Sequence, residues 1–433
     1  MLFYLFNIIK IGYNTQYNLD LLEVKKEINM ASYSLSSFKI RLINSILYEC
    51  FMQDLPLDQV YANHFKKIKL ETDEQSLIVN LVNDLIRRLN YYTYVAGYHK
   101  VKDGKKHINK LICALHIIRK WPVPKDLKDC DDFNVKLAKQ RMQEADEIPN
   151  LKYGCPAWID ALCKKELGDA WDNEKVSLGK EPKRYIRTNT LKTSKEKLAQ
   201  SLSASKIKTK AIDTAPDCLE IIGNAALFRT QAFKDGWFEQ QDLGSQLIAP
   251  FLNVKPGMRV VDACAGAGGK TLHLSALMQG KGMLIAMDNK EWKLKALKDR
   301  AKKAGAFNIE TRVIDNLKVI KRLKDTADRV LLDVPCSGLG VLKRNFDSKW
   351  IDSTQSIMEL IQIQENILEN YSQMLKVDGY LVYSTCSILP SENHKQIEKF
   401  LAKSPNFILE EERQIMPSEG GDGFYMARLK RIS

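Results

Sequence analysis

Apolar residues recur every three or four positions from about Ser36 to Ile118, which is the spacing of one buried helix face. The clearest runs are RLINSILYECF, EQSLIVNLVNDLIRRLNYYTYVAGY and KKHINKLICALHIIRKW. The sequence WPVPKD then ends the pattern, because proline disfavours helix at its own position and at the preceding one. We therefore predict an all-α domain over residues 30–149, rich in Lys and Arg.

The next section of the chain combines the spacing of helices with runs typical of strands. A polar stretch from Lys125 to Pro149 leads to a short helical segment, LKYGCPAWIDALCKKELG. Strand-like runs then alternate with one helix in KRYIRTNTLKTSKEKLAQSLSASKIKTKAIDTAPDCLEI, which predicts a small α+β module over residues 150–235. Four cations cluster around its first predicted strand: Lys183, Arg184, Arg187 and Lys192.

From residue 236 to residue 433, short apolar runs alternate with amphipathic helices. The runs are RVVD, MLIAMD, IETRVID, RVLLDVP and GYLVYSTCS. Strands that alternate with helices predict an α/β domain with a parallel sheet covered on both faces, a Rossmann-like architecture. Ligands of such sheets bind at the carboxyl ends of the strands. The candidate residues discussed below all fall at those ends.

Composition narrows the class of protein. The chain has 433 residues, enough for two or three domains. Lys and Arg total 66 against 53 Asp and Glu, a net charge of +13. That balance favours a polyanion or an anionic surface as partner, although a solvated basic surface would account for the charge equally well. The nine cysteines are scattered, without a CxxC pair or a Cys/His cluster, so we expect no metal site, no disulfide framework and a reduced, cytoplasmic setting.

The first 29 residues stand apart from this organisation. Their apolar run, MLFYLFNII, is too short to span a bilayer, and it lacks the features of a secretory signal. Met30 begins a more ordinary start, MASYSLSSFKIRLINSIL. We treat residues 1–29 as an extension, either poorly ordered or added by a misplaced start codon, and we expect no membrane association.

A glycine-rich turn follows the first strand of the α/β section, directly after Asp262. It consists of Cys264, Ala265, Gly266, Ala267, Gly268, Gly269 and Lys270. Glycine lets a backbone approach a ligand closely and adopt dihedral angles that other residues avoid. The turn fits neither the dinucleotide pattern GxGxxG nor the phosphate loop GxxxxGK[ST]. Taken alone, it is either a cofactor loop or a tight structural turn.

Three acids follow later strands of the same sheet. Asp288 ends the second strand, where a carboxylate can hold both hydroxyls of a ribose, and Asp315 follows the third, where it could meet an adenine amino group. Asp333 ends the fourth strand. Each acid alone would more simply cap a helix. Their order along one edge, beside the glycine-rich turn, favours a nucleotide-like cofactor.

Two cysteines occupy matched positions after neighbouring predicted strands. Cys336 lies in LDVPCSG and Cys386 in YSTCS. A single cysteine at a strand end is usually just a buried thiol. A pair in equivalent positions could instead face one pocket, and a thiolate there would be favoured by a basic neighbour such as Lys270.

These motifs together resemble those of the RsmB/NOP family of RNA cytosine-5 methyltransferases, in particular the bacterial 16S rRNA type. CAGAGGK at 264–270 stands where the family has CAAPGGK, and the TCS of 385–387 and the SEN of 391–393 match its signatures. ADRVLLDVPCSG departs mildly from the family's DAPCSG signature, with Ala327 in its first position. Gly266 and Ala267 replace Ala and Pro, and GVLKRNFDSKW departs from the family's G-x-x-R-R-x-P-D-x-K-W at Lys343 and Phe346. The resemblance covers about residue 150 to the end, and the departures bear on the shape of the loops.

The resemblance implies a class I methyltransferase domain that uses S-adenosylmethionine (SAM), preceded by a small RNA-binding subdomain and a NusB-like helical domain. It implies that residues 264–270, Asp288, Asp315 and Asp333 bind SAM. It also implies that Cys386 is the nucleophile and that Cys336 aids release. A thiolate that adds to carbon 6 of cytosine makes carbon 5 nucleophilic, which is covalent catalysis, and Asp333 could hydrogen-bond the base. The base must leave its stack to reach such a site.

RNA contacts are a further expectation. We predict that Arg187, Lys192, Lys343 and Arg344 bind phosphates, and that Tyr185, Phe346 and Trp350 are either stacking platforms or ordinary core residues. We expect the protein to be a monomer that acts on ribosomal RNA. Transfer RNA is the second candidate substrate. An RNA-binding assembly factor with a vestigial catalytic domain, or a nucleotide-dependent oxidoreductase, would fit the cysteine pair and the glycine pattern less well.

Overall fold

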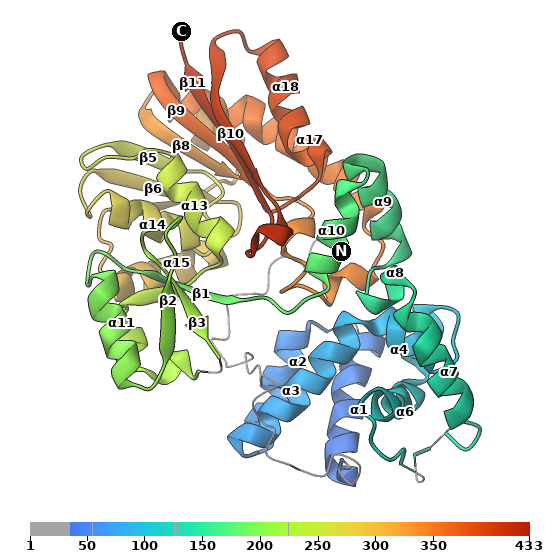
Figure 1. Cartoon of the computed structure of the whole chain (residues 1–433). Helices are drawn as coiled ribbons and strands as arrows, with labels where there is room; N and C mark the ends of the chain where they lie inside the picture. Colours follow the sequence, from blue (N-terminus) through green and yellow to red (C-terminus); the bar gives the residue numbers. More distant parts are fainter. Residues whose placement is uncertain (1–34, 54, 125–126, 129, 224) are drawn as a thin grey trace. The chain divides into compact units, whose positions relative to one another are not determined.

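A computed structural model describes residues 35–53, 55–124, 127–128, 130–223 and 225–433; the expected extension, residues 1–29, lies outside them. The chain forms two compact units (Figure 1). The first comprises the described residues up to Leu162 together with Trp171–Lys180 and Asn345–Asp352. The second comprises Cys163–Ala170, Glu181–Arg344 and Ser353–Ser433. Across the described ranges, no helix is long and apolar enough to cross a membrane.

The first unit is helical, as the apolar spacing predicted. Its elements are α1 (Ser37–Met52), α2 (Leu57–Lys67), α3 (Thr72–Arg87), α4 (Leu89–Val95), α5 (Val101–Lys106), α6 (Ile108–Ile118), α7 (Val135–Asp146), α8 (Pro149–Lys152), the first half of α9 (Ala157–Leu167), and α10 (Ala170–Leu178). Ser36 caps α1, since its side chain accepts a hydrogen bond from the Lys39 amide. The apolar faces of these helices meet in one core that includes Ile43, Ile46 and Leu85, all fully buried.

A segment distant in sequence completes that helical core. Residues 345–352 belong to the first unit, although the sequence alone assigns them to the α/β domain. Phe346 is buried in the core under the guanidinium of Arg87, which lies 4.4 Å from the ring centroid. The indole of Trp350 donates a hydrogen bond to the carbonyl of Ile86 over 2.6 Å. Phe346 and Trp350 are therefore packing residues of this unit, which is the ordinary core alternative of the two that the sequence left open.

The α+β module lies in the second unit. Its four-stranded antiparallel sheet has the order β2-β3-β1-β4, built from β1 (Arg184–Thr188), β2 (Lys208–Ala211), β3 (Cys218–Ile222) and β4 (Phe238–Gln240). Helices α11 (Lys195–Ala204) and α12 (Gln231–Lys234) accompany it. Leu198 and Leu202 of α11 pack on Ile186 and Leu219 of the sheet, which gives the module its own apolar core.

The rest of the second unit is a seven-stranded sheet with the order β10-β11-β9-β8-β5-β6-β7. Its strands are β5 (Arg259–Asp262), β6 (Met283–Asp288), β7 (Ile309–Val313), β8 (Ala327–Asp333), β9 (Leu375–Thr385), β10 (Phe407–Ile415) and β11 (Phe424–Arg431). The five strands β5 to β9 run parallel, as predicted, whereas β10 and β11 close the sheet antiparallel. The fold is the Rossmann-like α/β architecture expected from the sequence.

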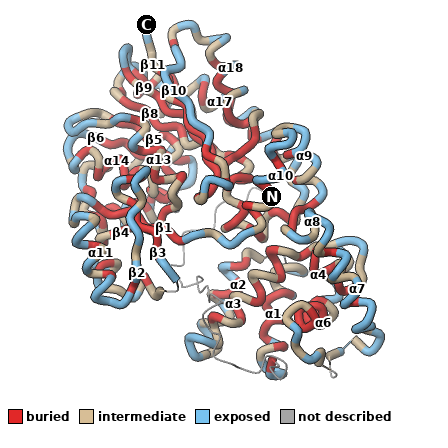
Figure 2. Tube along the Cα trace, viewed as in Figure 1, coloured by how far each residue is buried: buried red, intermediate tan, exposed pale blue. Residues whose placement is uncertain are grey.

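Helices cover both faces of this sheet, and its central strands β5, β6 and β8 are mostly buried, whereas the edge strand β10 is largely exposed (Figure 2). The flanking helices are α13 (Leu243–Phe251), α14 (Gly269–Leu277), α15 (Glu291–Ala304), α16 (Leu317–Lys321), α17 (Thr354–Tyr371) and α18 (His394–Lys403). Successive residues of β5 face opposite sides of the sheet. Val260 packs with α13 and α14, and Val261 packs in the core shared with α17 and α18. The carboxyl ends of the strands are thereby left at one edge.

Candidate active site

The glycine-rich turn joins the end of β5 to the start of α14. Gly268 has a φ of +91°, and a Cβ there would lie 2.6 Å from Cγ of Leu297, so only glycine fits. Gly266 has a φ of +55°, and a Cβ built on it or on Gly269 would meet nothing within 4 Å. The turn is thus tightly packed on one side and open on the other, which suits the close approach of a ligand.

Acidic side chains surround this turn. Asp288, at the end of β6, accepts hydrogen bonds from the amides of Gly266 at 3.0 Å and Lys290 at 2.8 Å. Asp262 is buried, and Thr271 donates to its Oδ2 over 2.7 Å, while its Oδ1 has no hydrogen-bond partner among the described residues. Burial raises the pKa of Asp262 to about 7. A buried acceptor without a partner beside an open turn is a place for a polar ligand.

Asp315 follows Ile314, whose amide donates to the carbonyl of Asp288 at 3.0 Å. It follows β7 as an exposed residue, and its carboxylate accepts a hydrogen bond from the side chain of Asn316 over 2.9 Å. Because it is exposed, a contact with a bound adenine remains a prediction. The structure brings the turn and Asp288 into direct contact, but it does not show such a contact for Asp315.

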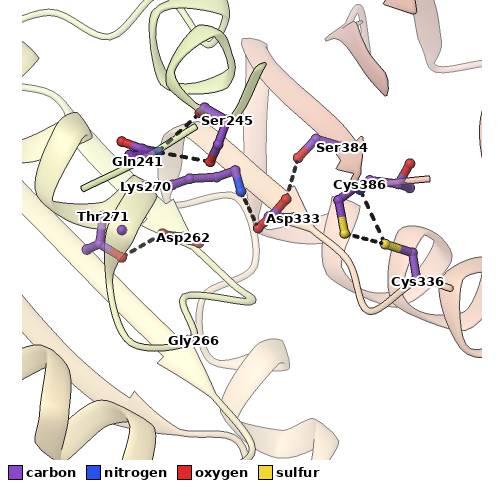
Figure 3. Close-up of polar contacts among 12 residues, drawn as sticks. Gln241, Ser245, Asp262, Gly266, Lys270, Thr271, Asp333, Cys336, Ser384 and Cys386 are labelled. Carbon is purple, nitrogen blue, oxygen red and sulfur yellow. Dashed lines mark hydrogen bonds and ion pairs between the residues drawn. The ribbon is translucent and has the colours of Figure 1, made fainter. Parts of the chain in front are cut away.

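A hydrogen-bonded chain runs from the glycine-rich turn to the end of β9 (Figure 3). Nζ of Lys270 donates to Oδ2 of Asp333 at 2.7 Å, and Oγ of Ser384 donates to Oδ1 of Asp333 at 3.0 Å. Burial by itself would lower the pKa of Lys270, but the carboxylate of Asp333, with smaller contributions from Cys386 and Asp262, outweighs it and raises that pKa. Lys270 is thus held as a cation close to Cys386.

The two cysteines meet at the ends of neighbouring parallel strands, as predicted. The register pairs Asp333 of β8 with Ser384 of β9, and each cysteine follows within three residues. The Sγ atoms of Cys336 and Cys386 lie 3.2 Å apart, and the Cys386 amide donates to Sγ of Cys336 at 3.2 Å. Cys336 is 5% exposed and Cys386 is more open. The hydrogen bond with Cys386, and then burial, raise the pKa of the Cys336 thiol well above its ordinary value, so this thiol keeps its proton.

Close backbone contact holds the two cysteine loops together. The amide of Gly340 donates to the carbonyl of Cys386 at 3.0 Å, and a Cβ on Gly340 would lie 2.8 Å from that oxygen and 2.3 Å from the carbonyl oxygen of Gly423. The glycine therefore permits an approach that a larger residue would prevent. Sequence reasoning passed over this contact, because it depends on which segments meet in three dimensions.

Three of the four predicted RNA contacts are engaged inside the protein. Arg187 is 2% exposed and donates to the carbonyl of Gly269 at 2.8 Å. Lys343 is 6% exposed and donates to the carbonyls of Pro417 and Gly421. Arg344 forms ion pairs with Asp242 and Asp422, both at 2.6 Å.

The phosphate contacts predicted at Arg187 and Lys343 are therefore wrong for this structure, because a buried cation needs partners of its own and finds them in the chain. The side chain of Arg344 is 22% exposed, and its guanidinium is engaged by the two carboxylates. Lys192 is exposed, and its ammonium donates to the carbonyl of Asp235, so it stays a candidate. Tyr185 is 3% exposed and belongs to the core.

Two protein-family models match parts of this chain. Residues 249–430 match the family model described as 16S rRNA methyltransferase RsmB/F, and residues 155–227 match the ferredoxin-like domain of RsmF/B-like methyltransferases. A probable ribosomal RNA small subunit methyltransferase B of Synechocystis is 34% identical over 300 residues, which cover 65% of this chain and 67% of that protein. The ribosomal RNA small subunit methyltransferase B of Yersinia enterocolitica is 34% identical over 283 residues, or 63% of this chain and 66% of that protein.

Solved structures agree with the fold. The crystal structure of PH0851 superposes with a TM-score of 0.77 at 25% identity and covers 92% of this chain and all of the other. NSun6 from Pyrococcus horikoshii, solved with SFG, has a TM-score of 0.59 at 21% identity over 64% of this chain and 98% of its own, which shows a shared fold. The glycine-rich turn, the acids beside it and these matches agree with the resemblance seen in the motifs: this chain belongs to the RsmB/F family of SAM-dependent methyltransferases.

Proposed function

We propose that this protein methylates carbon 5 of a cytosine in ribosomal RNA, most simply that of the small subunit, with Cys386 as the nucleophile. The observation that carries the proposal is the thiol pair of Cys336 and Cys386, 3.2 Å apart beside the ion pair of Lys270 and Asp333. The choice of ribosomal over transfer RNA is supported by the names of the relatives, which are ribosomal RNA small subunit methyltransferases.

The residues around the turn fit a bound SAM molecule. Gly266 and Gly269 leave open space above the turn, and Asp262 offers a buried acceptor without a partner. Asp288 lies beside Gly266, where a carboxylate can accept hydrogen bonds from ribose hydroxyls. Bound there, SAM supplies an electrophilic methyl group on a sulfonium sulfur. The task of the protein is to make carbon 5 of the base a sufficient nucleophile.

Cys386 performs that task in the proposed reaction. Its thiolate sulfur forms a bond to carbon 6, and the electron pair of the 5,6 double bond moves to carbon 5, which accepts the methyl group. A water molecule then takes the proton from carbon 5, which restores the double bond and expels the thiolate of Cys386. The ammonium of Lys270, held as a cation by Asp333, places a positive charge near the attacking sulfur.

Asp333 and Cys336 act on the same adduct. The carboxylate of Asp333 can accept a hydrogen bond from the exocyclic amine of cytosine, and from N3 once the adduct is protonated there. Cys336 keeps its proton because its pKa is raised, and its sulfur lies beside that of Cys386, so it can donate this proton to the Cys386 sulfur as the bond to carbon 6 breaks. The exposed Lys192 and the basic composition supply attraction to the phosphate backbone.

Methyl transfer from tritiated SAM tests the proposal. The full chain is incubated with 16S rRNA, with assembled small subunits and with total transfer RNA, and bisulfite sequencing then locates the methylated base. We expect incorporation at a single cytosine of ribosomal RNA. Methylation of transfer RNA alone would reject the proposed substrate. Binding to RNA without any incorporation would instead support an assembly factor with a vestigial catalytic domain.

A further inference from the structure

The carboxyl group of Glu392 lies between the loops that carry the two cysteines. Glu392 ends the short helix η6 (Pro390–Glu392) and is fully buried. Its Oε1 accepts hydrogen bonds from the amide of Ser337 at 2.8 Å and from Nε2 of Gln364 at 2.9 Å. Its Oε2 accepts from Oγ of Ser337 at 2.5 Å and from Oγ of Ser387. One carboxylate therefore collects four hydrogen bonds from three separate segments.

The two serines stand in equivalent places. Ser337 directly follows Cys336, and Ser387 directly follows Cys386. Their hydroxyl oxygens are 3.2 Å apart, the same distance that separates the two sulfur atoms. Because hydrogen bonds to an ionised acceptor are the strong ones, the shared carboxylate fixes the spacing of the two loops one residue away from the thiols.

The residues next to Glu392 hold it against the end of β9. The hydroxyl of Tyr383 donates to the carbonyl of Glu392 at 2.7 Å. Asn393 accepts from the hydroxyl of Thr385 at 2.6 Å and donates to the carbonyl of Ser387 at 3.0 Å. These bonds leave the carboxylate little freedom to follow one cysteine loop without the other.

We propose that Glu392 is a positioning residue that sets the distance between the sulfur atoms of Cys336 and Cys386, acting through Ser337 and Ser387. Its importance for methyl transfer rests on the proposed function, whereas its effect on the thiol spacing does not. Misplacement of reacting groups by about 1 Å costs about a hundredfold in rate. Glu392 also contributes, after the Cys386 hydrogen bond and burial, to the raised pKa of Cys336.

The first test needs no RNA. In a glutathione redox buffer, one oxidised glutathione converts two protein thiols to a disulfide and is released as two reduced glutathiones. The equilibrium constant for the Cys336–Cys386 bond, read by peptide mass spectrometry after acid quenching, measures the effective concentration of one thiol near the other. We expect E392Q and E392A to lower it at least fivefold. An unchanged value in both variants would overturn the proposal.

Two controls accompany this measurement. Glu365 is a second little-exposed carboxylate of the same unit, bonded to Lys399 and Lys403, so E365Q removes a charge from α17 and should leave the constant unchanged. Cys113 and Cys130 in the helical unit also have their sulfur atoms 3.2 Å apart, and they provide an internal reference in every variant. A parallel change at this second pair would indicate general unfolding and would count against a positioning role.

The second test is kinetic. E392Q should lower kcat for RNA methylation at least tenfold with KM for SAM and RNA within twofold, and S337A or S387A should add little in the E392Q background. A normal kcat, or a loss that matches a lowered folded fraction in thermal melting, would refute the role. If the unaltered protein methylates no RNA, the proposed function fails, while the thiol equilibrium still decides the role of Glu392.

Discussion

Lys270 donates a hydrogen bond from Nζ to Oδ2 of Asp333 at 2.7 Å, across 63 positions of the sequence. Lys270 lies in the first turn of α14, and Asp333 ends β8, which pairs with β5 in the sheet. The ion pair thereby joins the glycine-rich turn to the segment that leads to Cys336. In the proposed reaction, the cofactor site and the thiol pair therefore share this pair of charges.

Asp333→Asn should lower kcat about a hundredfold, since it removes both an acceptor for the base and the charge that holds Lys270 as a cation. The ion pair of Lys270 and Asp333 determines the direction in which the activity profile shifts with pH. Asp333 raises the pKa of Lys270, so without it the ammonium loses its proton at lower pH, and the alkaline limb of the residual activity should move to lower pH. A pH–rate profile under single-turnover conditions measures this. Asp378→Asn, at an exposed ion pair with Lys430, serves as control.

The two cysteines should give different defects. Cys386→Ala should abolish both methylation and the covalent adduct, because carbon 6 then has no nucleophile. Cys336→Ala should retain adduct formation but slow release, so that a protein–RNA band of lower mobility accumulates on a denaturing gel. Cys50→Ala, in the helical unit, should behave as the unaltered protein. Full turnover by Cys386→Ala would show that the assigned roles are wrong.

Two glycines of the turn should separate folding from cofactor binding. Gly268→Ala should cost about 2 kcal/mol or more, because its Cβ would lie 2.6 Å from Leu297 at a positive φ. Gly269→Ala meets no protein atom within 4 Å, and Gly269 lacks a positive φ, so this substitution should weaken SAM binding more than it lowers stability. Chemical denaturation and calorimetric titration with SAM measure the two effects. Equal loss of stability in both variants would contradict this distinction.

Substitution of Arg344 should lower stability, whereas substitution of Lys192 should weaken RNA binding. Arg344→Met leaves the carboxylates of Asp242 and Asp422 unpaired, and loss of one partner of a buried ion pair costs about 3 kcal/mol. Lys192→Met should leave the melting temperature unchanged and reduce the slope of RNA affinity against salt by about one unit. Filter binding at several salt concentrations, together with thermal melting, checks both. A changed salt slope in a fully folded Arg344→Met protein would support Arg344 as an RNA contact.

Lys349 should make stability depend on pH. It is 4% exposed, and burial, with repulsion from Arg87, lowers its pKa to about 7 from an ordinary 10.5. Between those values the unfolded chain binds one more proton than the folded chain, so stability should rise with pH by at most about 1.4 kcal/mol per unit. Lys349→Met should remove this rise and stabilise the protein at pH 7. Urea unfolding of the unaltered protein and of Lys349→Met at pH 7, 8 and 9 measures the free energy of unfolding. The same slope of this free energy against pH in both proteins would contradict the prediction.

The sequence alone was enough to predict what depends on local spacing. Period-3.6 and alternating runs placed the helices from Ser36 to Ile118 and the strands from β5 to β9, because each period reflects the geometry of one element. Ligands bind at the carboxyl ends of parallel strands, and this rule predicted that the turn, Asp288, Asp333 and both cysteines lie at one edge of the sheet. Their residue types were already distinctive enough to indicate the family.

Only the tertiary structure decided which polar and aromatic residues remain available. Arg187, Lys343 and Arg344 look like phosphate contacts in the sequence, but each is held by distant acceptors, and Phe346 is buried in the core of the other unit. Burial depends on partners that are far away along the chain, which a local pattern does not encode. The same holds for Glu392, whose four hydrogen bonds exist only because three separate segments meet around it.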